Sequence, residues 1–130
     1  MERVINHDML DFLRSKGIIT QAQHGFLRKH STSSNLLESL RDWSIALNRR
    51  QSVDVIYIDF RKAFDSVSHP KLIIKLVSAG ISGNLLNWIK AFLTNRTQSV
   101  KVADSLSNKI MVTSGVPQGS VLGPTLFVIF

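Results

Sequence analysis

Two aspartates follow an apolar stretch in the middle of the chain, where carboxylates could hold a metal ion. Residues 53–58 (VDVIYI) are rich in β-branched and aromatic side chains, which predicts a strand that ends at Asp59. A carboxylate at the end of a strand can be rigid and still reach solvent, and Mg²⁺ prefers oxygen ligands. Two such ions about 4 Å apart support phosphoryl transfer. The spacing equally allows Asp59 and Asp65 merely to cap turns.

A second segment that could carry chemistry is residues 114–124, where glycines surround a Pro-Gln pair. Glycine lets the backbone approach a ligand closely, and the amide of Gln118 can hydrogen-bond a base edge or a sugar hydroxyl. A tight structural turn is the common alternative. No Gly-Lys-Ser/Thr follows, so this is no phosphate-binding P-loop, and residues 119–123 (GSVLG) do not match the nucleophile elbow of serine hydrolases.

Composition limits the other classes of function. The chain has 130 residues, of which 44% are hydrophobic, and this suits one domain with a core. Its net charge of +7 favours a polyanionic partner such as nucleic acid. Without cysteine there are no disulfides or thiolate metal sites, and the four histidines lack the spacing of a zinc site. No apolar run reaches the ~20 residues that span a bilayer, so we expect an intracellular protein without a membrane partner.

The elements that must position these segments follow from hydrophobic spacing. Helices are predicted over residues 2–16, from an N-cap within 31–34 to 49–50, over 70–79 and 82–95, and from Pro124 onward. Residues 97–103 and 108–113, joined around 104–107, predict a hairpin with Val100 and Val102 facing Ile110 and Val112. The order ααβααββα lacks βαβ alternation and predicts an α+β fold with a small antiparallel sheet packed by helices. The apolar residues 126–130 have no cap or exit turn, which suggests a cut there.

Taken together, four ordered segments resemble the reverse transcriptases of non-LTR retrotransposons of the jockey and CR1 kind. The motif A segment (residues 53–69, VDVIYIDFRKAFDSVSH) and the motif B segment (residues 114–127, SGVPQGSVLGPTLF) are similar to motifs A and B of that family. Residues 85–102 resemble its helix and hairpin, and residues 23–37 (QHGFLRKHSTSSNLL) its fingers motif. The resemblance implies a partial right-hand polymerase, with partial fingers over 1–50 and partial palm over 51–130.

The resemblance also implies roles for individual residues. Asp59 matches the first catalytic aspartate, a ligand of both Mg²⁺ ions, and the backbone carbonyl of Phe60 matches the second metal contact of that strand. Phe64 matches the aromatic steric gate, which excludes a 2′-hydroxyl and so selects deoxynucleotides. Gln118 and Gly119 match the residues that line the incoming nucleotide.

Other positions of the resemblance carry less specific expectations. Arg28 and Lys29 fall where the fingers carry basic residues against template or nucleotide phosphates, and solvated surface charge is about as good an interpretation. Gly is common in the family where Lys29 stands, and Arg or Lys where His30 stands; a neutral His attracts phosphate less. Asp65 is a usual companion in the family, and we expect it to be structural.

The function that the resemblance implies is RNA-directed DNA polymerisation, with an RNA template, a DNA primer, deoxynucleoside triphosphates and two Mg²⁺ ions, and with nuclear action. The family completes its metal site with an Asp-Asp turn that the 130 residues do not contain, so we expect them to be inactive alone. The alternative is a degenerate copy that acts at most as a nucleic-acid-binding or interaction module. A group II intron or telomerase polymerase fits less well, because the sequence of residues 114–124 most resembles that of retrotransposon polymerases.

Overall fold

The structure is a computed structural model that describes every residue from 1 to 130. The chain divides into two compact units, one made of Met1–Ile18 with Lys62–Phe130 and the other of Ile19–Arg61. The elements in chain order are α1 (Glu2–Ser15), α2 (Thr32–Asn48), α3 (His69–Ser78), α4 (Gly83–Leu93), β1 (Thr97–Gln98), β2 (Lys101–Val102), β3 (Ser105–Leu106), β4 (Ile110–Met111) and α5 (Gly123–Ile129). This mixture of helices and small antiparallel sheets is compatible with the predicted α+β class.

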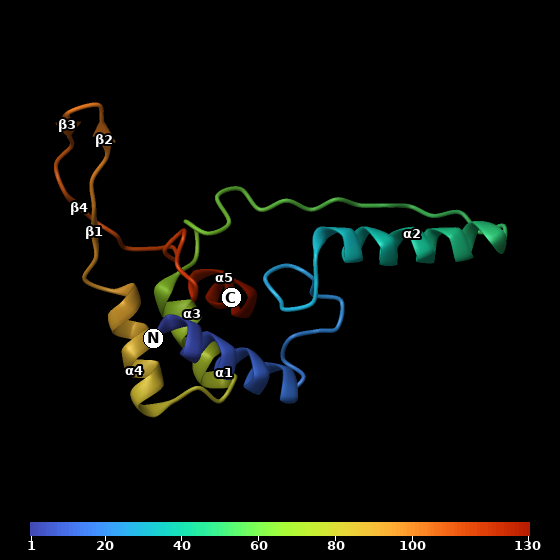
Figure 1. The fold of residues 1–130 in the computed structure, drawn as a ribbon, viewed down its shortest axis with the longest axis horizontal. Coiled ribbons are helices and arrows are strands. Elements are labelled where there is room, and N and C mark those ends of the chain that lie inside the picture. The colour runs from blue at the N-terminus through green and yellow to red at the C-terminus, as the bar shows by residue number, and fades with distance from the viewer. The chain divides into compact units, whose positions relative to one another are not determined.

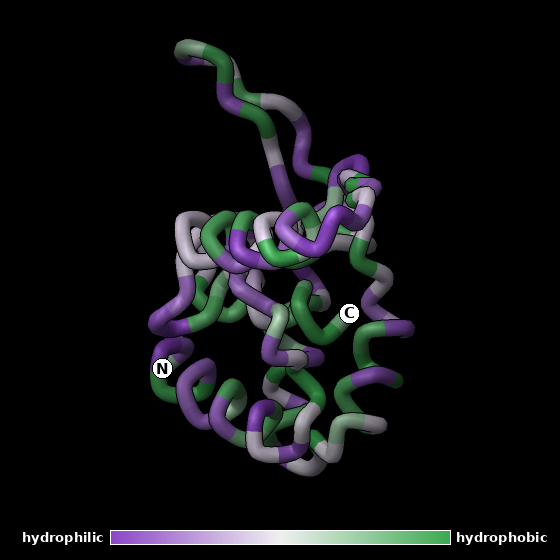
Figure 2. Tube along the Cα trace, turned by 90° about the vertical axis from the view of Figure 1, so that its right-hand side faces the viewer, coloured by the Kyte–Doolittle hydropathy of each residue, from purple (hydrophilic) through white to green (hydrophobic).

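The first unit has a core between α1, α3, α4 and α5 (Figure 1). Apolar residues four apart lie on one face of a helix, and hydrophobic and hydrophilic residues accordingly alternate along these helices (Figure 2). The buried members of the core include Met9, Leu13, Leu72, Leu76, Ile89, Leu93, Leu122 and Leu126. Each fully buried leucine contributes about 1.5–3 kcal/mol relative to an exposed one, so this core fixes the helices that carry the site.

The predicted helices of the first unit are confirmed. The helix expected over residues 2–16 is α1, those over 70–79 and 82–95 are α3 and α4, and the last helix has its proline in the first turn. Ser82 stands at the N-cap of α4 as predicted, but its side chain makes no capping hydrogen bond. None of the helices has the length and apolar character needed to cross a bilayer.

The hairpin of the first unit is confirmed, but its predicted register is wrong. β1 pairs with β4 so that Gln98 lies opposite Ile110, and β2 pairs with β3 so that Val102 lies opposite Ser105. The chain turns at residues 103–104, earlier than predicted. Every residue of these strands is exposed. Side-chain alternation predicts the register of a hairpin only where one face of the hairpin is buried. Neither face is buried here, so the alternation could not predict the register.

The second unit contains the turn-rich residues 19–31, then α2 and an extended segment. The N-cap, predicted to lie within residues 31–34, is Ser31. Its hydroxyl accepts from the Ser34 backbone N–H, while the Ser34 hydroxyl accepts from the Ser31 backbone N–H. This reciprocal pair satisfies two donors that a helix start leaves free. α2 has no buried residue, and Leu36, Leu37 and Leu40 on its apolar stripe are more than half exposed.

The predicted strand over residues 53–58 is wrong: the segment runs extended between α2 and α3 (Figure 1) but belongs to no sheet. None of its backbone N–H groups donates to another backbone carbonyl. Ile56 and Tyr57 are 84% and 86% exposed. The β-propensity of such residues reflects packing on a pleated surface beside a neighbouring strand, and no such neighbour is present for this segment.

Candidate functional site

The motif A and motif B segments are joined directly in the first unit by main-chain hydrogen bonds. The N–H of Gly115 donates to the carbonyl of Val67 at 2.8 Å, and the N–H of Val116 donates to the carbonyl of Phe64 at 2.9 Å. The hydroxyl of Ser114 adds a bond to the carbonyl of Asp65 at 3.0 Å. Residues 64–67 and 114–116 are therefore held together by three hydrogen bonds.

Close packing at Gly115 explains why this junction requires glycine. Its φ is +87°, in the region that L side chains rarely adopt. A Cβ atom there would lie 3.0 Å from both the Cα of Asp65 and the carbonyl oxygen of Phe64. These neighbours are backbone atoms, which cannot turn away as the end of a side chain could.

The buried imidazole of His69 adds a further connection between the two segments. Its Nε2 lies 2.7 Å from the carbonyl oxygen of Gly115. A carbonyl only accepts, so Nε2 carries the hydrogen. The spacing of histidines in a sequence can indicate a zinc site, but it does not indicate a contact with a residue 46 positions away. The sequence therefore could not predict this role of His69.

The side chains of Asp65 and Gln118 meet on the exposed side of the junction. Gln118 Nε2 donates to Asp65 Oδ1 at 2.9 Å. The carboxylate therefore orients the amide, which is the side chain that the sequence predicts to line a nucleotide. This contact is compatible with the structural role expected for Asp65.

The ring of Phe64 packs against α5. It stacks on the ring of Phe127 with centroids 4.9 Å apart and planes 17° apart, an arrangement that stabilises aromatic pairs. Phe64 is half-buried, so part of its surface stays open. Phe64 and Gln118 thus lie on the same joined piece of backbone.

The turn that carries Gln118 is closed by one serine. Ser120 Oγ donates to the carbonyl of Pro117 at 2.7 Å and accepts from the N–H of Gly123 at 2.9 Å. A Cβ on Gly123 would lie 2.6 Å from the Pro117 carbonyl oxygen, a distance that real contacts do not show. Gly119 is exposed on this turn with φ +83° and open space where a Cβ would be.

A polar hollow of about 660 Å³ opens beside Asp65 and Gln118. Its lining includes two cationic residues, Lys62 and Arg96, together with Asp65 and residues 110–118. The Asp65 carboxylate thus lines the hollow, and the two cations, the Gln118 amide and the hydroxyl-bearing residues around it suit a polar ligand that carries negative charge.

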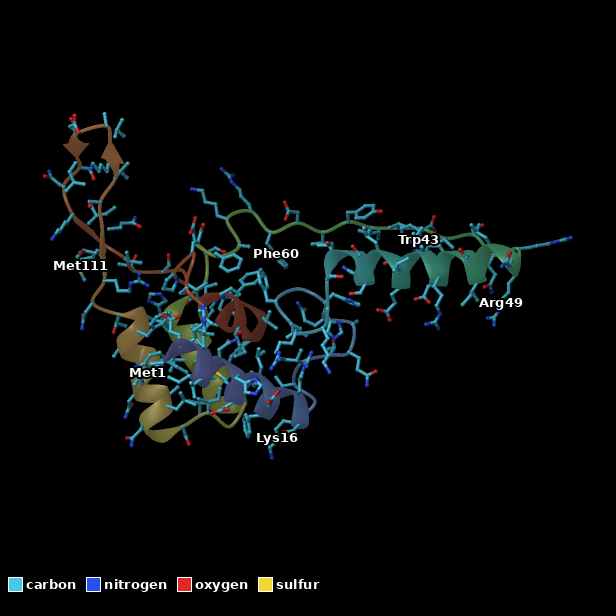
Figure 3. The ribbon with its side chains drawn as sticks, viewed as in Figure 1. Met1, Lys16, Trp43, Arg49, Phe60 and Met111 are labelled. Atoms are coloured by element: carbon cyan, nitrogen blue, oxygen red, sulfur yellow. The ribbon has the colours of Figure 1, made fainter.

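The remaining predicted residues lie in the second unit. Asp59 and Phe60 are exposed on the extended segment, where Figure 3 labels Phe60. Their carboxylate and carbonyl oxygens are of the kind that Mg²⁺ prefers. Nowhere do three or more acidic or histidine side chains gather into a group that could hold a metal ion. The donors present therefore suit the metal in kind but do not complete a site.

The segment that resembles the fingers motif is fastened to α2 by His24. Its Nδ1 lies 2.9 Å from Ser34 Oγ and its Nε2 lies 2.7 Å from Glu38 Oε2. Arg28 and Lys29 are exposed on the turn between His24 and α2. Lys29 has φ +63°, which fits a position where the family commonly has glycine.

Comparison with known proteins agrees with the motifs. The family model described as "Reverse transcriptase (RNA-dependent DNA polymerase)" matches residues 1–130. The chain is 35% identical over 130 residues to the RNA-directed DNA polymerase from mobile element jockey of Drosophila funebris, covering 100% of the chain and 14% of that relative. It is 33% identical over 129 residues to the probable RNA-directed DNA polymerase from transposon BS of Drosophila melanogaster, covering 99% of the chain and 14% of that relative.

A third relative is from another organism. The Retrovirus-related Pol polyprotein from type-1 retrotransposable element R2 of Popillia japonica is 33% identical over 130 residues, covering 98% of the chain and 18% of that relative. The chain thus spans less than a fifth of the length of the curated relatives it matches. No solved structure matches it.

Proposed function

The chain belongs to the reverse transcriptase (RNA-dependent DNA polymerase) family, and from this premise we propose that it forms part of the fingers and palm of a retrotransposon RNA-directed DNA polymerase. Residues 1–50 would supply part of the fingers, and residues 51–130 part of the palm. The proposed substrates are an RNA template, a DNA primer and deoxynucleoside triphosphates. The primer 3′-hydroxyl would attack the α-phosphate of the nucleotide and release pyrophosphate.

The observation that carries this proposal is the direct joining of the two motifs. Three hydrogen bonds hold residues 64–67 against residues 114–116, and a fourth orients Gln118 on Asp65. A polymerase needs its nucleotide-contacting groups in a fixed relation, because misplacement by about 1 Å costs around 100-fold in rate. Phe64 and Gln118 have such a relation here.

The side chains of the junction have separate proposed tasks. Phe64 would lie under the sugar of the incoming nucleotide and exclude a 2′-hydroxyl by contact. Gln118 and Gly119 would line the nucleotide, the first by its amide and the second by its exposed backbone. Lys62 and Arg96 would attract phosphates into the hollow beside them.

In the second unit, Asp59 and the carbonyl of Phe60 are the proposed Mg²⁺ donors. When bound, Mg²⁺ stabilises the charge that develops on the transferred phosphoryl group. Further ligands would have to come from outside these 130 residues, because no other acidic or histidine group gathers into a site. We therefore propose that the 130 residues do not polymerise DNA alone. Arg28 and Lys29 would contact template or nucleotide phosphates.

Primer extension by the full-length protein that carries this chain tests the proposal. The variant Asp59→Asn removes the metal-binding charge, and Asp54→Asn is a matched control in the same exposed segment. Loss of a partner that only supports a metal ligand costs about 10–100-fold, so loss of the ligand should cost at least that much. We expect Asp54→Asn to keep full activity and Asp65→Asn to lose less than Asp59→Asn. Full activity of Asp59→Asn would remove the metal assignment.

Nucleic-acid binding without polymerisation is the second candidate, and the net charge of +7 favours it. Its signature is a wild-type protein that binds RNA with an affinity falling steeply as salt rises, yet never extends a primer. That result would identify a repurposed copy.

A further inference from the structure

The first turn of α1 is hydrogen-bonded to the residues at the start of α5, far away in the sequence; we call this contact the grip. Glu2 Oε2 accepts from the N–H of Val121 at 2.9 Å and from the N–H of Leu122 at 3.2 Å. Val121 precedes α5 and Leu122 is its N-cap, so neither N–H donates within the helix, and a hydrogen bond to a carboxylate is stronger than one to a neutral acceptor. Glu2 therefore fixes a backbone that lies 119 residues away.

One turn further along α1, Asn6 makes a second connection on the same face. Asn6 Oδ1 accepts from the hydroxyl of Thr125 at 2.5 Å. Thr125 is only 2% exposed, so its hydroxyl would cost free energy if it were left without a partner. Two polar residues four apart on α1 thus reach two successive points of the motif B segment.

These contacts end close to the residues that would meet the nucleotide. Val121 follows Gly119 by two positions and Gln118 by three. Ser120, which lies between Gly119 and Val121, closes the turn by bonding both the Pro117 carbonyl and the Gly123 N–H. A turn closed in this way transmits the position of Val121 to Gln118. On its other side, Gln118 is held by Asp65.

We propose that Glu2 is a positioning residue for the Gln118 turn, with Asn6 as its support. The proposal rests on the proposed function of Gln118 as a nucleotide contact. Glu2 touches no substrate; it holds the Val121 and Leu122 amides so that the Gln118 amide and the Gly119 backbone face the nucleotide. It is distinct from the metal-binding assignments, because α1 and α5 belong to the unit that does not contain Asp59.

The expected kinetic effect is on nucleotide binding. Gln118 would contact the nucleotide in the ground state and the transition state alike, and loss of uniform binding raises KM while kcat stays nearly constant. For Glu2→Gln, which keeps the size and removes the charge, we expect an increase of about ten-fold in KM for the deoxynucleotide. Glu2→Asp keeps the charge on a shorter arm and should recover part of the loss. The KM for the template-primer should not change.

The test uses the full-length polymerase and two independent readouts. Amide hydrogen exchange over a peptide that spans residues 119–126 reports the grip itself, and primer extension reports its effect on KM. Asp8→Asn is the matched control, because Asp8 is exposed on the same helix and also loses a negative charge. We expect exchange about ten-fold faster in Glu2→Gln and unchanged in Asp8→Asn.

Each result has a defined meaning. Unchanged exchange in Glu2→Gln would disprove the grip, whether or not the protein polymerises. Faster exchange with an unchanged KM would disprove the positioning role. A wild-type protein that extends no primer would contradict the proposed function, while exchange would still decide whether Glu2 holds the turn. If Glu2→Gln does not fold, Thr125→Val can replace it, because this variant exchanges the hydroxyl for a methyl group and so removes only the bond to Asn6. Amide exchange and KM should then rise, each by less than the ten-fold expected for Glu2→Gln.

Discussion

The imidazole Nε2 of His69 lies 2.7 Å from the carbonyl oxygen of Gly115, and this bond links the first residue of α3 to the junction of the motif A and motif B segments. His69 is 8% exposed, so water competes little for this carbonyl. The helix that follows the motif A segment is thereby tied to the loop that precedes α5. A change at His69 should loosen the junction without touching any residue proposed to meet substrate.

Replacement of His69 separates the donor from the bulk of the side chain. His69→Leu fills the space but leaves the Gly115 carbonyl without its donor, which should lower the free energy of unfolding by about 1–3 kcal/mol. His69→Gln places an amide N–H near the position of Nε2 and should cost less. Urea unfolding of the two variants measures this difference. If the leucine variant is as stable as the glutamine variant, the hydrogen bond contributes nothing.

Gly115 allows a test of close approach between the two segments. Gly115→Ala adds a Cβ 3.0 Å from the backbone of Asp65 and Phe64, in addition to the strain of a left-handed φ. Gly17→Ala is the matched control, because Gly17 also has a positive φ, +66°, but has nothing within 4 Å of the added atom. We expect Gly17→Ala to cost about 1–2 kcal/mol from backbone strain alone, and Gly115→Ala to cost clearly more. Equal losses in thermal or chemical unfolding would mean that the junction yields easily.

The backbone conformation of Lys29 leads us to expect that a substitution there stabilises the protein. It holds φ +63° on a turn, where a side chain costs roughly 1 kcal/mol relative to glycine. Lys29→Gly should therefore raise the melting temperature, whereas Arg28→Gly, at a neighbour without positive φ, should lower it because glycine adds entropy to the unfolded chain. If Lys29 also contacts phosphate, its loss weakens RNA binding and lowers the salt slope by about one. A melting temperature lower than wild type for Lys29→Gly would contradict the strain.

The helices were predictable because their signals are local. In α1, Met9 and Leu13 lie four apart and both are buried, and in α2 the N-cap Ser31 bonds a residue only three positions away. Such contacts depend on spacing that the sequence displays directly. Helix bounds therefore came within two residues of the structure.

The strand and the hairpin register were not predictable in the same way. Residues 53–58 have the composition of a strand, but a strand also needs a neighbour, and composition does not show whether one is present. In the hairpin, Val102 lies opposite Ser105 because the chain turns early, and no buried face opposes that choice.

The candidate site was found in its parts but not in its connections. Asp59, Phe64 and Gln118 were identified by resemblance, which assigns a residue to a position along the chain. The bonds that fasten the site join residues 46 to 120 positions apart, as His69 to Gly115 and Glu2 to Leu122 show. Only the folded chain brings such pairs together, and no periodicity in the sequence marks them.

The stacked pair of Phe64 and Phe127 leads to a prediction about sugar selection. If the Phe64 ring excludes the 2′-hydroxyl, Phe64→Ala should raise ribonucleotide incorporation by roughly ten-fold or more, because a methyl-sized difference in a fitted pocket already changes discrimination by that amount. Phe127→Ala removes the ring that fixes Phe64 at 4.9 Å and should relax selection in the same direction, but less. Phe92→Ala breaks an equivalent stack on Trp88 in α4 and serves as the control.

Single-nucleotide extension by the full-length polymerase, with matched deoxy- and ribonucleotides, gives kcat/KM for each sugar. The ratio of the two values cancels any general loss of stability that removing an aromatic ring brings. Unchanged ratios in Phe64→Ala would remove the gate. A ratio that changes in Phe64→Ala but not in Phe127→Ala would show that Phe64 holds its place without α5, so the stack would be a contact of the core and not part of sugar selection.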